Sequence, residues 1–176
     1  MKAFIFHCWG GDGKSCWSSW LCDYLHNKNI ETKSPDFPDT NNPNLTKWLD
    51  SIRNINKKFN EKDEWVLVGH SLGCPTILRL LESFGPDEHV KKVILVAGFA
   101  KDLGIPEIRN FVDMEFNWKK IKSKCDEFVL ISSDNDPFIP LDEGERVAKL
   151  LGAKFVVEKN AGHLNDFSCP RLIDLL

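Results

Sequence analysis

Residues 65–73 read Trp65-Val66-Leu67-Val68-Gly69-His70-Ser71-Leu72-Gly73. An apolar run leads into a Gly-x-Ser-x-Gly turn, and a helical pattern follows at once from Thr76 to Glu82. This order is typical of a nucleophile elbow, in which a strained turn between a strand and a helix presents a serine hydroxyl above a sheet. Gly69 and Gly73 carry no Cβ where strand and helix must pass close together. The stretch therefore predicts that Ser71 is a nucleophile.

Around this stretch, β-prone apolar segments alternate with segments of helical periodicity. Strands are predicted at 2–7, 30–34, 65–69, 92–98, 128–132 and 154–157. Helices are predicted at 15–26, at 44–59, from the elbow to 84, at 118–123, at 141–151 and at the C-terminus. Alternation at this spacing indicates an α/β fold, with a mostly parallel sheet covered by helices on both faces. With no internal repeat or linker in the sequence, residues 1–176 are predicted to form a single domain.

Composition excludes several functional classes. The chain is 42% hydrophobic and 28% charged with a net charge of −3, as in an ordinary soluble globular protein. Basic residues do not cluster, so neither a nucleic acid nor an anionic membrane is expected as a partner. The N-terminal apolar run at 3–6 is too short for a signal peptide, and no run approaches a membrane span, so a cytoplasmic location is expected.

Six cysteines stand at positions 8, 16, 22, 74, 125 and 169. None forms a Cys-x-x-Cys pair, and no Cys/His spacing is typical of a zinc site. In a chain without a secretion signal, these are expected to be reduced thiols rather than a disulfide framework. We expect neither a metal nor a cofactor.

The loops after the last two predicted strands offer partners for Ser71. Asp134 and Asp136 follow the strand at 128–132, and His163 follows the strand at 154–157. Ser, then Asp, then His is the chain order of the α/β-hydrolase triad. A serine hydroxyl needs an imidazole to take its proton, and the imidazole needs a carboxylate on its other nitrogen. Either aspartate could instead have no catalytic role and serve to form the turn. Pro137 favours Asp136, because it pushes the preceding residue into an extended conformation.

An oxyanion hole requires two backbone N–H groups. One should come from the residue after the nucleophile, Leu72, and the other from an early strand-to-helix loop. The loop after the strand at 2–7 is the natural source, which predicts Trp9 as the second donor, with Cys8 beside it.

A nucleotide site competes for the same loop. Gly10, Gly11 and Gly13 precede Lys14-Ser15, which resembles a phosphate-binding loop. That motif requires a further glycine at position 8, where this chain has Cys8. The glycines are therefore interpreted as a tight turn beside the substrate.

Several motifs together resemble one family. They are His7-Cys8-Trp9, Gly69-His70-Ser71-Leu72-Gly73-Cys74-Pro75, Val96-Ala97-Gly98-Phe99-Ala100-Lys101-Asp102-Leu103, Trp118-Lys119-Lys120-Ile121, Ser133-Asp134-Asn135-Asp136-Pro137-Phe138-Ile139-Pro140 and Gly162-His163. This ordered set resembles the small serine hydrolases of the α/β-hydrolase class, the retinoblastoma-binding-protein type and its bacterial relatives. The resemblance covers nearly the whole chain.

The resemblance implies a hydrolase with little or no lid domain and a triad of Ser71, Asp136 and His163. It also implies small carboxylic esters, or amino-acid esters and amides, as substrates. Relatives often have glycine where this chain has Cys8, so its side chain would narrow the pocket or alter the oxyanion loop. The Leu-x-Cys-x-Glu motif for retinoblastoma binding is absent, because Thr76 stands in the glutamate position.

The predicted function is cleavage of a small-molecule ester or amide through an acyl-enzyme on Ser71. The alternative is a protein-binding module on a hydrolase scaffold with vestigial activity, because a fold does not establish a function. The aromatic residues Trp9, Phe99, Phe111, Phe116 and Phe138 could line an acyl pocket or belong to the core. The physiological substrate, protein partners and the oligomeric state cannot be predicted from the sequence.

Overall fold

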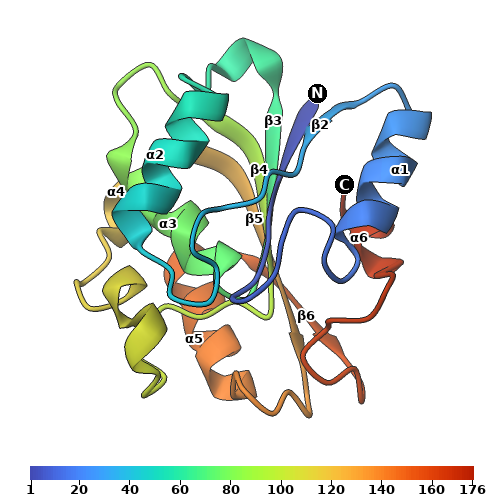
Figure 1. Ribbon diagram of the computed structural model, residues 1–176, viewed down its shortest axis with the longest axis vertical. Coiled ribbons are helices and arrows are strands. Elements are labelled where there is room, and N and C mark those ends of the chain that lie inside the picture. The colour runs from blue at the N-terminus through green and yellow to red at the C-terminus, as the bar shows by residue number, and fades with distance from the viewer.

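Six strands form one all-parallel sheet in a computed structural model that describes all residues from 1 to 176 (Figure 1). The spatial order is β2-β1-β3-β4-β5-β6. The strands are β1 (Lys2–Phe6), β2 (Glu31–Lys33), β3 (Trp65–His70), β4 (Val90–Val96), β5 (Cys125–Ser133) and β6 (Lys154–Glu158). Since parallel strands end at one edge of a sheet, the loops after β1, β3, β5 and β6 gather there.

Helices cover both faces of the sheet. On one face lie α1 (Ser18–Asn27) and α6 (Arg171–Leu175), and on the other α2 (Leu45–Ile55), α3 (Gly73–Ser83), α4 (Trp118–Lys122) and α5 (Leu141–Leu151) (Figure 1). Two 3₁₀ helices, η1 (Glu61–Asp63) and η2 (Pro106–Phe111), lie in loops. None of the helices combines the length and hydrophobicity needed to cross a lipid bilayer. The sheet and its two helical layers confirm the predicted α/β architecture.

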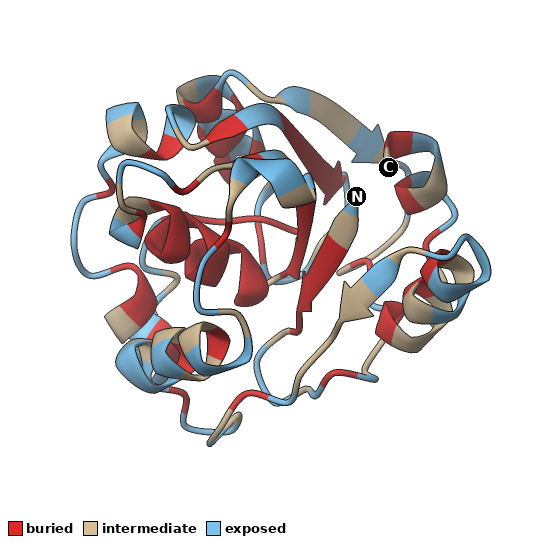
Figure 2. Cartoon of the chain, turned by 90° about the horizontal axis from the view of Figure 1, so that it is seen from above, coloured by how far each residue is buried: buried red, intermediate tan, exposed pale blue.

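The core explains why the central strands are continuous apolar runs. All six residues of β3 are buried, as are nine consecutive residues of α3, because other elements cover both. Buried residues fill the middle of the molecule, whereas the edge strands β2 and β6 are mainly half-buried or exposed (Figure 2). A single cluster of 48 buried hydrophobic residues joins the two faces. The loops that carry the candidate site are thus attached to strands that are packed in the core.

Two predicted helix boundaries are wrong, and the backbone shows why. The helix predicted at 15–26 begins only at Ser18, because Cys16 has a left-handed φ of 54° that breaks the helical path. The helix predicted at 44–59 ends at Ile55, since Asn56 is extended. Phe59 fits the apolar period because it is fully buried, but it reaches the core from a loop.

Candidate active site

Ser71 lies in a sharp turn between β3 and α3. Its φ is 51°, a left-handed value that is uncommon for a residue with a side chain, and its N–H donates to the Val96 carbonyl at 2.9 Å. A Cβ on Gly73 would lie 2.3 Å from the Phe6 carbonyl oxygen, and one on Gly69 would lie 2.9 Å from Gly73. The close approach predicted for both glycines is therefore present. It places Ser71 beyond the end of β3.

His163 and Asp136 are hydrogen-bonded to each other. His163 Nδ1 lies 2.8 Å from Asp136 Oδ2 and 3.0 Å from Oδ1. A carboxylate can only accept, so Nδ1 carries the proton and Nε2 keeps the lone pair in the neutral ring. The Asp136 side chain is 2% exposed. Burial alone would raise the pKa of Asp136, but bonds from His163 and the Ile139 and Phe138 amides outweigh it and hold this pKa below its ordinary value.

The loop that carries His163 is fastened to the loop after β5. The side-chain oxygens of Ser133, Asp134 and Asn135 accept the consecutive amides of residues 161, 160 and 162, at 3.1, 2.8 and 2.8 Å. Asp134 thus braces the histidine loop, and Asp136 is the aspartate that contacts His163. The sequence favours Asp136 as the partner of His163 but gives no sign that Asp134 braces the histidine loop.

Two further side chains support the His163 loop from behind. His70 Nε2 donates to the His163 carbonyl at 3.0 Å, and Trp17 Nε1 donates to the Leu164 carbonyl at 3.0 Å. Both side chains are buried. Sequence reasoning missed both roles, because His70 is the variable position in Gly-x-Ser-x-Gly and Trp17 fits an ordinary core pattern.

A cavity of about 300 Å³ opens at Ser71. Its lining residues are Cys8, Trp9, Cys16, His70, Ser71, Leu72, Phe99, Leu103, Ile105, Ile108, Phe138, Ile139, His163 and Asn165. Three of the five aromatic residues left open by the sequence therefore line it, namely Trp9, Phe99 and Phe138. The other two, Phe111 and Phe116, are buried in the core. The walls are mostly apolar, and the same cavity is lined by Ser71, His163 and two cysteines.

The loop after β1 contributes Cys8 and Trp9 to the lining of this cavity. Trp9 and Leu72 lie outside all helices and strands, and neither amide donates to a backbone carbonyl of the chain. His7 fixes the loop, since its Nδ1 donates to the Cys8 carbonyl at 2.8 Å while its Nε2 accepts from the Phe37 amide at 2.9 Å. Both bonds require the neutral ring, and burial lowers the pKa of His7 accordingly.

Two thiols face the same cavity. The sulfur atoms of Cys8 and Cys16 and a ring nitrogen of His70 lie within 4.8 Å of one another. Hydrogen bonds to the Cys16 thiolate lower the pKa of Cys16 to about 5. The bond from the Cys8 thiol has the larger effect, and the bond from His70 has the smaller one. The contact with Cys16, together with burial, raises the pKa of Cys8. All six cysteines are free thiols.

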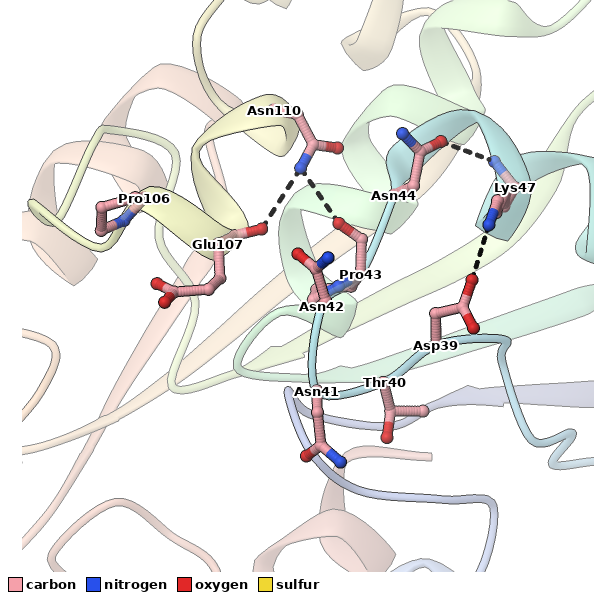
Figure 3. A pocket seen from close by; sticks show the side chains of 10 residues that line it. All are labelled: Asp39, Thr40, Asn41, Asn42, Pro43, Asn44, Lys47, Pro106, Glu107 and Asn110. Atoms are coloured by element: carbon pink, nitrogen blue, oxygen red, sulfur yellow. Dashed lines mark hydrogen bonds and ion pairs between the residues drawn. The ribbon is translucent and has the colours of Figure 1, made fainter.

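A larger hollow of about 760 Å³ shares no lining residue with this cavity. Its walls come from residues 39–44, Lys47 and part of η2, and none of them is hydrophobic (Figure 3). Some of its polar groups are paired: Asn110 donates to the Pro43 and Glu107 carbonyls, and Lys47 Nζ lies 2.6 Å from Asp39 (Figure 3). Neither a histidine nor a cysteine lines it. We therefore place the candidate chemistry at Ser71.

Comparison with known proteins agrees with this choice. The sequence model of the family described as serine hydrolase matches residues 3–169. The chain belongs to the serine hydrolase family. This confirms the resemblance drawn from the motifs.

Curated relatives of this serine hydrolase match along almost their whole length. The hydrolase YdeN of Bacillus subtilis is 29% identical, with 99% of this chain and 94% of the relative aligned. The serine hydrolase RBBP9 of Rattus norvegicus is 26% identical, with 93% and 87% aligned.

Solved structures show the same architecture. The crystal structure of the B. subtilis ydeN product superposes with a TM-score of 0.93 at 27% identity, covering 99% of this chain and 95% of that one. The structure of BpoC from Mycobacterium tuberculosis has a TM-score of 0.71 at 14% identity, with 99% and 90% covered, which shows the shared fold alone. This serine hydrolase therefore has the α/β-hydrolase fold.

Proposed function

We propose that this serine hydrolase cleaves small carboxylic esters, or related acyl and amide bonds, through an acyl-enzyme on Ser71. The observation that carries the proposal is the meeting of Ser71 and His163 in one cavity, with His163 Nδ1 bonded to Asp136 at 2.8 Å. That bond leaves Nε2 with the lone pair that a general base requires.

Each residue has a definite step in this mechanism. His163 takes the proton as Ser71 Oγ attacks the carbonyl carbon, and it returns the proton to the leaving group. Asp136 holds the ring in the required tautomer and stabilises the imidazolium. The Trp9 and Leu72 amides are the proposed oxyanion donors, because both line the cavity and neither has a backbone acceptor. Water then releases the acyl group by the reverse path.

The cavity favours a short or compact acyl group. Its volume of about 300 Å³ lies at the low end of ligand pockets, and apolar side chains such as Phe99 and Ile108 form its walls. A series of p-nitrophenyl esters of increasing chain length should therefore show a maximum in kcat/KM at short chains. Rising activity up to long acyl chains would contradict this substrate class.

A fluorophosphonate probe tests the proposed function directly. It should label the folded wild-type protein stoichiometrically and leave Ser71→Ala unlabelled. Asp134→Asn is the matched control and should still be labelled, because Asp134 makes no hydrogen bond to His163. No labelling of folded wild-type protein would contradict the hydrolase and favour a binding module.

A further inference from the structure

Cys8, Cys16 and His70 bring two sulfur atoms and one ring nitrogen together in the wall of the cavity at Ser71. The three ligand atoms lie within 4.8 Å of one another. They come from the loop after β1, the turn before α1 and the last residue of β3. No short sequence spacing reveals the cluster, because 54 positions separate Cys16 from His70 in the chain.

Thiolate and imidazole are the ligands that zinc prefers in proteins. With Zn–S bonds of about 2.3 Å and Zn–N bonds of about 2.0 Å, tetrahedral geometry places ligand atoms about 3.5–3.8 Å apart. Atoms that lie within 4.8 Å of one another reach this spacing by shifts of about 1 Å, which side-chain rotation supplies. A donor set without carboxylates disfavours magnesium and calcium, which take oxygen ligands.

The surroundings of the cluster suit a metal. His70 Nε2 donates to the His163 carbonyl at 3.0 Å, so Nδ1 keeps the lone pair in the neutral ring. A backbone acceptor on the other ring nitrogen is the usual outer contact of a zinc-bound histidine. The Cys8 thiol packs against Gly11, where a Cβ would lie 3.0 Å from the sulfur. Cys16, with its left-handed φ, lines the cavity instead of continuing α1.

We propose that Cys8, Cys16 and His70 form a zinc site whose fourth position opens into the cavity at Ser71. Three protein ligands with one open position is a common zinc arrangement. A zinc ion there would lie at the cavity that Ser71 also lines, where it would reduce the space open to a substrate. Bound zinc therefore inhibits the enzyme, a consequence that rests on the proposed hydrolase function.

Cobalt binding tests the site without any assay of activity. The full-length protein, reduced with a phosphine and freed of metal with EDTA that is then removed, is titrated with Co²⁺. One equivalent should produce sulfur-to-cobalt charge-transfer absorption and the intense visible bands of tetrahedral cobalt, and Zn²⁺ should abolish both. Cys8→Ser and Cys16→Ser should each weaken binding by about 100-fold or more. Cys22→Ser, a half-buried cysteine on α1 outside the cluster, is the control and should bind like the wild type.

A wild-type measurement keeps the proposal falsifiable if a variant fails to fold. Zn²⁺ should slow the alkylation of Cys8 and Cys16, mapped by mass spectrometry, and leave that of Cys22 unchanged. Absence of charge-transfer bands in the wild type, binding that survives both cluster substitutions, or unchanged alkylation of Cys8 and Cys16 would each overturn the site.

The inhibitory role is tested separately. Zn²⁺ should suppress ester hydrolysis by the wild type, EDTA should restore it, and the fractional suppression should disappear in Cys16→Ser. A cobalt spectrum without inhibition would keep the site and overturn its blocking role. Absence of fluorophosphonate labelling on metal-free protein would refute the hydrolase and leave the cobalt result intact, so the two proposals fail in different ways.

Discussion

The loops after β5 and β6 and the loop after β1 both reach the cavity at Ser71, but they contribute different chemistry to it. The first pair is joined by hydrogen bonds from Ser133, Asp134 and Asn135, and it holds His163 against Asp136. The loop after β1 is fixed through His7, and its Cys8 faces the cavity beside Cys16. One side is thus built to hold a proton-transfer pair in place. The other side presents soft, ionisable sulfur next to the nucleophile.

The largest expected effect comes from removing the nucleophile between the two sides. Ser71→Ala should lower kcat for a good ester substrate by about 10⁶-fold, by analogy with other serine triads. Steady-state kinetics on purified protein measures this, with circular dichroism to show that the fold is kept. A loss of less than tenfold would mean that another group, such as Cys16, performs the attack.

On the hydrogen-bonded side, substitution of Asp136 and of Asp134 should affect catalysis to very different extents. Asp136→Asn leaves the shape intact but offers His163 an amide that favours the wrong tautomer, so kcat should fall by about 10⁴-fold. Asp134→Asn keeps a side-chain oxygen that can accept the Asn160 amide and removes only the negative charge, so it should cost at most about 1 kcal/mol of unfolding free energy, with kcat within about tenfold of the wild type. Kinetics and denaturant unfolding of the pair measure both effects. A larger kcat loss for Asp134→Asn would reverse the assignment.

On the thiol side, the lowered pKa of Cys16 should make this cysteine react faster with an alkylating agent. The contacts with Cys8 and His70 lower the pKa of Cys16, whereas burial raises the pKa of Cys22, so a larger fraction of Cys16 than of Cys22 is thiolate at pH 6. Lower intrinsic nucleophilicity offsets part of this advantage, so iodoacetamide at pH 6 should modify Cys16 about tenfold faster than Cys22. Peptide mapping against time gives both rates. A Cys16 rate that rises tenfold per pH unit between 6 and 8 would contradict the lowered pKa.

The smallest effect is a pH dependence of stability on the hydrogen-bonded side. The pKa of Asp136 is lower in the folded protein than in the unfolded chain, so its stabilising contribution is present above the unfolded pKa. It is lost as the pH falls through the lower folded pKa. The wild type should exceed Asp136→Asn by about 2 kcal/mol in unfolding free energy at pH 7, and this difference should shrink below about pH 4. A difference that grows on acidification would contradict the shift.

The sequence predicts the fold well where periodicity and burial agree. α5 runs from Leu141 to Leu151 as predicted, because one apolar face packs on the sheet and Gly152 ends the helix in a left-handed conformation. Boundaries fail where a single backbone angle decides them. A cysteine side chain does not indicate a left-handed φ, so the predicted start of α1 lies three residues before the observed one.

Part of the candidate site can likewise be predicted from the sequence, and part cannot. Chain order and loop position select Ser71 and His163 and leave Asp134 and Asp136 as alternatives, since strand ends of a parallel sheet converge. Pro137 and the family resemblance then favour Asp136. The Cys8–Cys16–His70 cluster cannot be predicted, because its members meet only through tertiary packing. The brace role of Asp134 and the support from His70 and Trp17 depend on backbone partners more than 25 residues away, which no motif encodes.

The site of covalent attachment tests most directly whether serine or sulfur attacks the substrate. Protein reacted with a fluorophosphonate or a slowly hydrolysed ester is quenched in acid and digested with trypsin. Because the cavity holds both Ser71 and Cys16, the two residues must fall in different peptides, and they do, in 63–79 and 15–28. Our account predicts one adduct per chain, on Ser71 in peptide 63–79. An adduct on Cys16 or Cys8, or no adduct on the folded protein, would contradict it.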